Sequence, residues 1–525
     1  MAGKIMKNNF QTIGICLILC LCSLSGCVED KRVSLPPEED TPLPSNVFVT
    51  GPDGLGIEEE PLPMDFVFSN VDEQGAEPSI GVTSSGCIFF IAFEKPMRSC
   101  DNGQSWVWSA QGDPSQAQFT NDPYGWVDPV TDRVFNIHMM GLYTTWIGWS
   151  DDDGENWQGN PHEGLVPIND HIKLGSGPWT DEGYGQQPLR YERAVYFCYN
   201  KLLYISCYTS YDGGATFEVG GDIIGLATTN GGLHGAITSA PDGTVYLPPR
   251  VSTPAIIFSK DNGLTWEERT MGEDVGTPNP RKNGEVATDT ESNAYNIWVG
   301  SDQGVYMSRS TDSGNTWEQT STRISPIEVI SATFPHTSAG DPGRIAVTYL
   351  GSENASSLGQ PNIDGEPWDG NAHYAPSNVS HYLYITYSLN ALDPEPVFHT
   401  HRVSPDPVQV GSICLNSGDC RDIGGSNRNL LDFNDLHIDL EGRVYIAFAD
   451  GCTGTCASGN DTTPENSRDR LGSVYYLGNG PSLYDVGDLT EFYPPEEGNS
   501  KKSSLLPMFF VGMCILPQPF RRFRQ

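Results

Sequence analysis

The stretch Ser150-Asp-Asp152-Asp-Gly154-Glu-Asn-Trp157 decides the fold, because its pattern of Ser, Asp, Gly and an aromatic residue occurs five times along the chain. The aspartate at its third position can accept hydrogen bonds from backbone N–H groups of the same loop. The glycine two residues later permits the positive φ of a tight corner, and the final ring can pack back into a sheet. The pattern therefore predicts a repeated hairpin turn between two strands.

The other four copies occupy residues 99–106, 210–217, 259–266 and 310–317. The conserved position of the pattern holds Asp101, Asp152, Asp212, Asp261 and Asp312, spaced by 51, 60, 49 and 51 residues. Similarity at a period of this length is the signature of a repeat architecture, in which each repeat is one supersecondary unit.

The motif resembles the Asp-box, or BNR repeat, of the β-propellers of the sialidase superfamily, which includes non-enzymatic relatives. The resemblance implies an all-β propeller over residues 62–480, in which each box joins the outer two strands of a blade on the face away from the ligand. It also implies that the five box aspartates are structural and not catalytic.

Two further units follow the same order of strands without a box, beginning at ISATFPHTSAG (330–340) and FNDLHIDLEG (433–442). Five units with a box and two without one favour a propeller of seven blades, with six as the alternative. The last unit has three clear strands, and we predict that residues 65–71 (DFVFSNV) supply the fourth. Such a clasp would join the two ends of the ring and remove exposed sheet edges.

Composition agrees with many short strands. The 525 residues include 57 Gly and 39 Pro, which interrupt helices, and 11 Trp, 22 Tyr and 21 Phe, which supply core. The formal net charge of −37 repels phosphate backbones, so we expect no nucleic-acid partner. The acidity is compatible with calcium binding, but no metal site and no other cofactor is predicted.

The N-terminus has the features of an export signal. Lys4 and Lys7 precede an apolar run, residues 13–24, that is too short to span a bilayer. It ends in Leu24-Ser25-Gly26-Cys27, which looks like a bacterial lipobox. We therefore predict a lipoprotein-type signal peptide over 1–27, with lipidation at Cys27; an ordinary signal peptide is the alternative. The protein is expected on the extracellular face of the cell membrane, or secreted.

Two further segments lie outside the expected propeller. Residues 28–61 are predicted to be a flexible linker, because they are acidic and rich in proline. Residues 481–525 are predicted to form a second linker and a short tail, in which an apolar run is followed by arginines.

Eight cysteines lie between the signal and the tail. An even number in an exported protein favours disulfides. The short spacings suggest four local pairs: Cys87–Cys100, Cys198–Cys207, Cys414–Cys420 and Cys452–Cys456. The connectivity is an inference from spacing alone.

The channel face of the propeller is the expected ligand face, formed by the starts of inner strands and by the loops after second strands. Candidates at inner-strand starts are Glu77, His234, Glu285, Asp432 and Asp435. Candidates in the loops are Glu94, Arg98, Arg250, Glu353 and Asp450. Any one of these side chains could instead be a solvated charge at the rim. Together they suggest an acidic funnel with Arg250, suited to a polar or sugar ligand.

The densest polar cluster is Asp432-Phe-Asn-Asp435-Leu-His437, where Asp435 and His437 share one strand face. An acid near a histidine could act in general acid–base catalysis, or the cluster could be a structural network. For an enzyme, we predict Asp435, Glu285 and Arg250 as catalytic residues. Glu77, Glu94, Arg98, His234, Asp432, His437 and Asp450 are then predicted to bind the ligand.

The features that make such a propeller a sialidase are not recognisable here. No F/Y-R-I-P sequence precedes the first box, and nothing marks an arginine triad. Three hypotheses remain: a surface-anchored, monomeric propeller that binds extracellular glycans or proteins, a glycoside hydrolase, or a structural or assembly factor. A pair of facing carboxylates near an Arg or Tyr would favour the enzyme, and aromatic platforms without such a pair would favour the binding protein.

Overall fold

The computed structural model describes residues 46–490, except 110, 114–115, 117–118, 164–168, 181–190, 202–203, 218, 224–231, 280–281, 417–426 and 458–468. The predicted signal peptide, Cys27 and the tail beyond residue 490 lie outside these residues. The described regular structure is β-strand, with two short 3-10 helices, η2 (Ala355–Ser357) and η3 (Ala372–Tyr374), and no α-helix.

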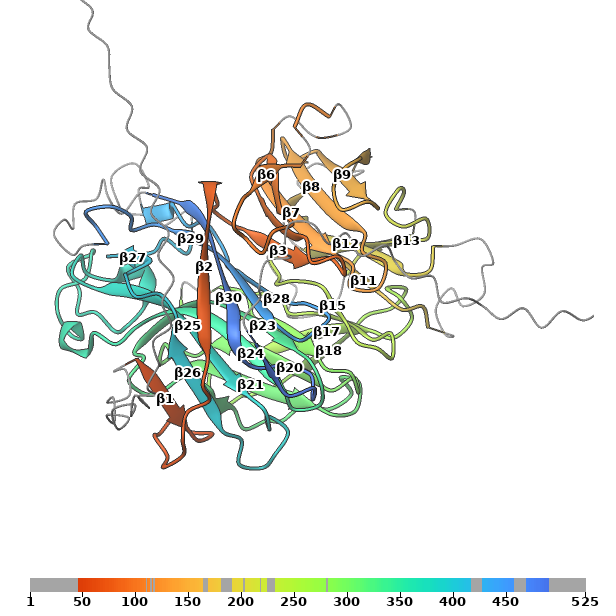
Figure 1. The fold of residues 1–525 in the computed structure, drawn as a ribbon. Coiled ribbons are helices and arrows are strands. Elements are labelled where there is room, and N and C mark those ends of the chain that lie inside the picture. The colour runs from red at the N-terminus through yellow and green to blue at the C-terminus, as the bar shows by residue number, and fades with distance from the viewer. Residues whose placement is uncertain are drawn as a thin grey trace, which may run out of the picture. The chain divides into compact units, whose positions relative to one another are not determined.

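Seven antiparallel sheets make up the described chain, and we number them as blades 1 to 7 (Figure 1). Blade 1 contains β3 (Ser79–Val82), β4 (Ile88–Ala92), β5 (Lys95–Ser99) and β6 (Val107–Trp108). Blade 2 contains β7 (Asp122–Val127), β8 (Val134–Met140), β9 (Thr144–Ser150) and β10 (Gln158–Glu163). Blade 3 contains β11 (Asp170–Gly177), β12 (Ala194–Lys201), β13 (Tyr204–Ser210) and β14 (Val219–Asp222). Blade 4 contains β15 (Thr238–Ser239), β16 (Val245–Leu247), β17 (Ala255–Ser259) and β18 (Glu267–Thr270).

The last three blades include the two that have no box. Blade 5 contains β19 (Glu285–Thr288), β20 (Ala294–Val299), β21 (Val305–Ser310) and β22 (Thr322–Arg323). Blade 6 contains β23 (Ser331–Ala339), β24 (Ile345–Ser352), β25 (Ser380–Ser388), β26 (Phe398–Arg402), β27 (Gln409–Val410) and β1 (Val47–Thr50). Blade 7 contains β28 (Asp435–Ile438), β29 (Val444–Asp450), β30 (Leu471–Pro481), β31 (Asp488–Leu489) and β2 (Asp65–Gln74).

The inner strands close into a ring. The first strand of each blade contacts the first strand of the next, through β3, β7, β11, β15, β19, β23 and β28, and β28 contacts β3. This arrangement confirms the all-β propeller and decides for seven blades over six. Because each sheet is covered by neighbours on both faces, whole strands such as β4, β17 and β20 are buried and show no alternation.

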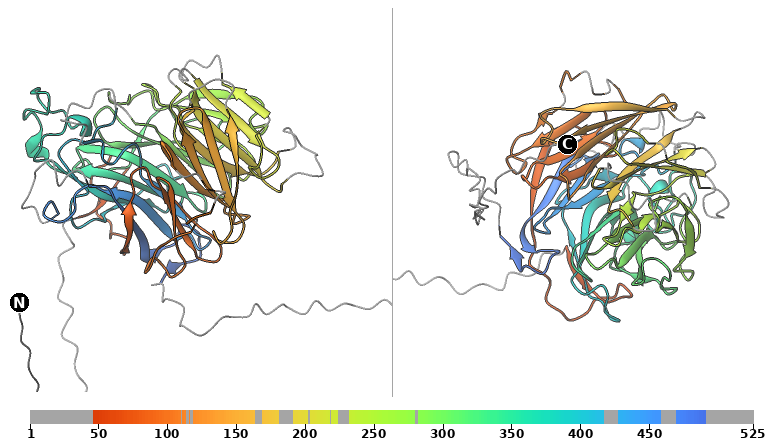
Figure 2. Two further views of the ribbon diagram at one scale, coloured as in Figure 1. Left: turned by 90° about the horizontal axis from the view of Figure 1, so that it is seen from above. Right: turned by 90° about the vertical axis from the view of Figure 1, so that its right-hand side faces the viewer.

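The predicted clasp is present. Strand β2 pairs antiparallel with β30 along blade 7, for example Phe68 opposite Tyr475. Figure 2 shows the N-terminal strands in orange beside the C-terminal strands in blue from two sides. The outer strand of the last blade therefore comes from the start of the chain, and its pairing closes the ring.

The boundaries predicted for the two linkers need correction. Residues 28–61 were expected to be flexible, but β1 lies within them and pairs with β26, with Val47 opposite His401. Residues 481–525 were expected to lie beyond the propeller, but β31 pairs with the end of β30. Residues 47–50 and 488–489 are part of the propeller because each adds a strand to a sheet and so pairs backbone groups of its edge.

The boxes form turns at the end of the third strand of blades 1 to 5. In blade 2, the Asp152 carboxylate accepts hydrogen bonds from the Asn156 backbone N–H (2.8 Å) and the Ser150 hydroxyl (2.8 Å). The corner glycine has a φ of 75°, and a Cβ there would come within 2.9 Å of the Phe89 ring of blade 1. The box glycine therefore serves both the turn and the close packing of one blade on the previous one.

Three of the predicted disulfides are present: Cys87–Cys100, Cys198–Cys207 and Cys452–Cys456. The first two join neighbouring strands of one blade, and in blade 3 the two cysteines lie directly opposite each other. The fourth predicted pair includes Cys420, which lies outside the described residues.

Candidate functional site

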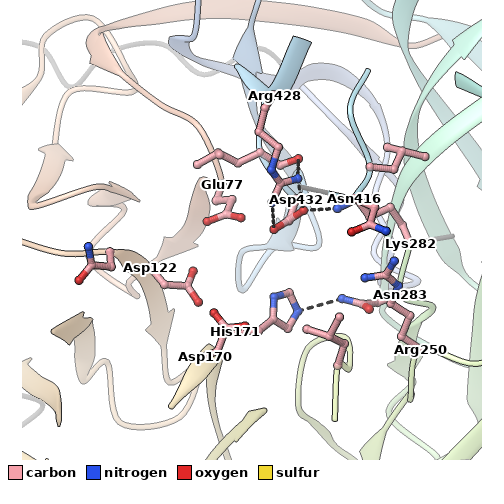
Figure 3. A pocket seen from close by; sticks show the side chains of 14 residues that line it. Glu77, Asp122, Asp170, His171, Arg250, Lys282, Asn283, Asn416, Arg428 and Asp432 are labelled. Carbon is pink, nitrogen blue, oxygen red and sulfur yellow. Dashed lines mark hydrogen bonds and ion pairs between the residues drawn. The ribbon is translucent and has the colours of Figure 1, made fainter. Parts of the chain in front are cut away.

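A pocket of about 240 Å³ opens on the channel face, where the inner strands begin (Figure 3). In an antiparallel blade, the start of the first strand lies at the opposite end from the turn between the third and fourth strands. The pocket and the boxes are therefore on opposite faces. The pocket is lined by Glu77, Asn121, Asp122, Asp170, His171, Leu233, Arg250, Lys282, Asn283, Leu415, Asn416, Arg428, Leu431 and Asp432.

Glu77 is the central acid of this pocket. Figure 3 shows its side chain between those of Asp122 and Asp432. Burial raises the pKa of Glu77 well above its usual range, and the charges of Asp122 and Asp432 raise it further. Glu77 is therefore the carboxyl of the cluster that keeps its proton. Its backbone φ of 53° is left-handed, which costs energy for a non-glycine residue.

Asp122 is the second buried acid. Burial raises its pKa to about 6, whereas the charge of Lys173 lowers it. One of its oxygens, Oδ2, accepts a hydrogen bond from the backbone N–H of Ile172 in the next blade, at 3.3 Å. The pKa of Asp122, about 6, is thus below neutral pH, whereas the pKa of Glu77 is raised well above its usual range.

Asp432 belongs to a partly buried ion cluster. Arg428 donates to both of its oxygens, from Nη1 (2.5 Å) and Nη2 (2.6 Å), and Lys282 Nζ contacts the same carboxylate. Although burial alone would raise it, Lys282 and Arg428 hold the pKa of Asp432 well below its usual range. Burial lowers the pKa of Lys282 to about 8. Asp432 is therefore an ionised partner of two cations rather than an acid that exchanges protons.

His171 lines the floor between the acids and the cations. Burial and the charge of Lys173 lower its pKa well below the usual range, so the ring is neutral. Its Nε2 lies 2.7 Å from the His234 carbonyl oxygen, to which it donates, and the Asn283 amide lies 2.9 Å from the same nitrogen. A β-bulge in β11, with a φ of 53° at His171, directs this ring toward the pocket.

Three of the predicted site residues meet in the pocket: Glu77, Arg250 and Asp432. Figure 3 shows Arg250, Lys282 and Asn283 on the opposite side from Asp122 and Asp170. The pocket thus has an acidic wall from blades 1 to 3 and a basic wall from blade 4 and the segment before blade 5.

Asp435 and Glu285 do not line this pocket; Asp435 lines a second pocket of about 210 Å³ with His336 and His437. Asp435 Oδ2 accepts the Ile80 backbone N–H (2.8 Å), and Asp435 Oδ1 lies 3.0 Å from His336 Nε2. Glu285 Oε2 accepts the Ala236 backbone N–H at 2.8 Å. Both acids accept a backbone N–H from a neighbouring blade, and their catalytic role stays a prediction.

The two predicted histidines are also buried in the channel wall. His234 Nδ1 lies 2.8 Å from the Gly235 carbonyl oxygen, and burial lowers its pKa to about 3. The His437 ring packs edge-on against Trp126, and burial lowers its pKa to about 4. Neither ring lines the pocket on the channel face.

Three loop predictions fall outside the pocket as well. Arg98 Nη1 donates to the Asp153 carbonyl oxygen (2.5 Å) and pairs with Glu155 (2.7 Å), so it holds the box of blade 2 instead of a ligand. Asp450 accepts the Cys452 backbone N–H at 2.9 Å, and burial raises its pKa to about 7. Glu94, in the loop after β4, is not among the lining residues.

Sequence reasoning missed Asp122, Asp170, His171, Lys282, Asn283 and Arg428. A signal for the first two exists, because three inner strands begin with the dipeptide Asn-Asp, at 121–122, 169–170 and 434–435. No comparable sequence signal marks the bulge that directs His171 toward the pocket. None marks the turn that brings Arg428 back to Asp432.

The remaining observations concern metals and membranes. Within the described ranges, no group of three or more His, Cys, Asp or Glu side chains is placed to hold a metal ion. In the same part of the chain, no helix has the length and apolar character needed to cross a membrane.

Comparison with known proteins gives similarity to solved structures alone: no family model and no curated protein matches. A protein of unknown function from Dyadobacter fermentans is 12% identical, with a TM-score of 0.36, over 80% of this chain and 98% of its own. The α-L-arabinanase of Penicillium chrysogenum is 11% identical, with a TM-score of 0.35, over 65% and 98%. The NanB sialidase of Streptococcus pneumoniae is 10% identical, with a TM-score of 0.37, over 80% and 70%. Scores this low do not distinguish one ligand from another, and the fold rests on the seven sheets themselves.

Proposed function

We propose that the pocket on the channel face binds a carbohydrate and cleaves a glycosidic bond. The observation that carries this proposal is the pair Glu77 and Asp122, two adjacent buried carboxyls whose surroundings push their pKa values apart. Hydrolysis of a glycosidic bond needs one carboxylic acid that protonates the leaving oxygen and one carboxylate that acts as base or nucleophile. Glu77 is suited to the first role and Asp122 to the second.

The lining of the pocket supports cleavage over simple binding. Of the fourteen residues described around it, none is Trp, Tyr or Phe, the platforms on which binding propellers would stack a sugar ring. The lining instead supplies carboxylates on one side and Arg250, Lys282 and Asn283 on the other. Hydrogen-bonding groups on both walls suit the hydroxyl groups of a sugar, and the basic wall suits a sugar that carries a carboxylate.

A panel of fluorogenic glycosides tests this proposal, with neutral pentosides and hexosides, uronides and sialosides. We expect turnover of at least one class by the full chain, and a loss of about 10²- to 10⁴-fold in Asp122→Asn, the range contributed by a positioned acid or base. Asp151→Asn is the matched control, because Asp151 lies in the box of blade 2 on the opposite face. Equal loss in both variants, or turnover unaffected in Asp122→Asn, would contradict the assignment.

Binding without cleavage is the second candidate, favoured by the ion cluster in which Arg428 and Lys282 already neutralise Asp432. A glycan array probed with the wild type separates the two. If the protein binds a class of glycan on the array but cleaves no glycoside of that class, it is a binding protein.

We further propose that the protein is exported and held at the cell surface through a lipid on Cys27. The lipobox Leu24-Ser25-Gly26-Cys27 supports this proposal. In a bacterial host that processes lipoproteins, labelled palmitate should enter the wild type and not Cys27→Ser. Equal labelling of both, or of neither, would contradict lipidation at this residue.

A further inference from the structure

Lys173 is a buried ammonium group on the same strand as the pocket residues Asp170 and His171. It lies on β11, in the inner strand of blade 3, and its residue is only 3% exposed. Its Nζ has no hydrogen-bond partner among the described residues, although an ammonium group can donate three hydrogen bonds. A buried charge without hydrogen bonds is costly, so other interactions must stabilise this one.

Two aromatic rings enclose the ammonium. Lys173 Nζ lies 3.6 Å from the centre of the Phe433 ring and 4.4 Å from the centre of the Tyr124 ring. A cation over the face of a ring is attracted by the negative charge of that face, and most strongly when water is excluded. The rings hold the charge in place without neutralising it.

Four carboxyl groups interact electrostatically with the ammonium: Asp122, Glu77, Glu285 and Asp435. Two of these, Glu285 and Asp435, already accept backbone N–H groups of neighbouring inner strands. The other two line the pocket. Of the neighbouring charges that lower the pKa of Asp122, that of Lys173 is the largest, whereas on Glu77 it is outweighed by Asp122 and Asp432.

We propose that Lys173 is a positioning residue whose buried ammonium, held over the Tyr124 and Phe433 rings, favours the carboxylate form of the neighbouring Asp122. This inference rests on the proposed glycosidase function and deepens it. The geometry places the ammonium next to Asp122 without placing it in the pocket lining: its Nζ lies over the ring of Tyr124, two residues after Asp122 on β7, and the backbone N–H of the adjacent Ile172 donates to Asp122 Oδ2 at 3.3 Å. Lys173 can therefore bias the pair electrostatically without taking part in bond cleavage.

Other charged groups face the same site. The nearby acids Asp170 and Asp432 oppose ionisation of Asp122, and Arg428 attracts it. Lys173 also lowers the pKa of the neutral rings of His171 and His234, so neither histidine competes for the proton. Lys173 is therefore the cation of blade 3 on which the ionisation of Asp122 depends.

The pH profile of kcat/KM tests this role. Lys173→Met keeps the length and apolar stem of the side chain but removes the charge, and we expect the acidic limb of the profile to move up by at least one pH unit. At the pH of the wild-type limb, the rate then falls about tenfold and recovers as the pH rises. Lys201→Met is the matched control, because Lys201 belongs to the same blade and pairs with Asp222 away from the channel. A profile of Lys173→Met that overlays the wild type would overturn the inference.

A titration without substrate separates this inference from the proposed function. The Asp122 carboxyl is followed by ¹³C NMR of labelled protein and assigned by its loss in Asp122→Asn. An upward shift of this titration in Lys173→Met, in a protein that cleaves no glycoside, would support the role of Lys173 and reject the glycosidase. Cleavage of a glycoside together with an unshifted Asp122 titration in Lys173→Met would support the glycosidase and reject the role of Lys173.

Lys173→Arg keeps the inference testable if Lys173→Met does not fold. Arginine retains its charge at every accessible pH, so the Asp122 titration should stay within about half a unit of the wild type. A rise as large as a full unit in Lys173→Arg would overturn the inference.

Discussion

Carboxyl groups have opposite pKa shifts on the two faces of this propeller. On the box face, Asp101, Asp152 and Asp312 lie in solvated turns, where hydrogen bonds from the loop outweigh the effect of burial and lower the pKa. On the channel face, burial and neighbouring carboxylates raise the pKa of Glu77 and Asp122. The difference teaches that the surroundings of a carboxyl group, and not its repetition along the chain, separate the acids that fold the turns from those suited to chemistry.

Opening the ring should change the protein most, because the difference between the two faces exists only while the blades form a closed ring. Deleting residues 61–72 removes most of β2, the outer strand of blade 7, and exposes the edge of β30. We expect loss of cooperative thermal unfolding, measured by calorimetry. Phe68→Ala is the control, because it removes one ring contact with Tyr475 and keeps the strand. A sharp, normal transition in the deletion variant would show that the clasp is dispensable.

Removing a charge on each face should give the next largest effect. Asp432→Asn leaves the partly buried cations of Arg428 and Lys282 without their shared partner, and we expect a loss of about 1–3 kcal/mol in the free energy of unfolding. Asp151→Asn breaks the more exposed pair with Arg133 and should cost about 0–1 kcal/mol. Urea denaturation of both variants measures the difference. Similar losses would mean that the channel-face cluster is not buried as described.

The pH dependence of stability should differ more subtly between the faces. The folded pKa of Asp122, about 6, lies above its unfolded value, so ionisation of Asp122 disfavours the folded state as pH rises through this window. Asp122→Asn should therefore gain about 1–2 kcal/mol over the wild type at pH 7 relative to pH 4. For Asp152, the folded pKa is lowered, so its contribution is present above the unfolded value and is lost on acidification below about pH 4. An Asp122→Asn effect that is independent of pH would contradict the raised pKa.

The sequence predicted the scaffold well, because its determinants are local and repeated. Each box carries its own turn, and the run DFVFSNV was recognisable as the missing strand of blade 7. The site depended on features without a local pattern. The bulge at His171 changes which residues of β11 face the channel, and Lys173 lies within a strand whose neighbours are buried.

The differences from the predicted site have a common physical cause. Placement at the start of an inner strand was read as access to ligand, but in Asp435 and Glu285 the carboxylate is used to bond the backbone of an adjacent blade. Arg98 was placed on the channel face from its loop position, whereas pairing of β5 with β6 turns it toward the box of the next blade. Whether a side chain at the end of a strand faces a ligand or a neighbouring blade depends on contacts between blades. The sequence of a single repeat does not reveal these contacts.

One measurement tests the central claim most directly: the rate of cleavage of the best fluorogenic glycoside by Glu77→Gln and by Asp152→Asn, each checked for folding by its melting temperature. We predict that Glu77→Gln melts like the wild type and loses at least about a hundredfold in rate. Asp152→Asn should melt earlier and keep the wild-type rate below its transition. Full activity in folded Glu77→Gln, or a comparable loss of rate in folded Asp152→Asn, would contradict the division of labour between the two faces.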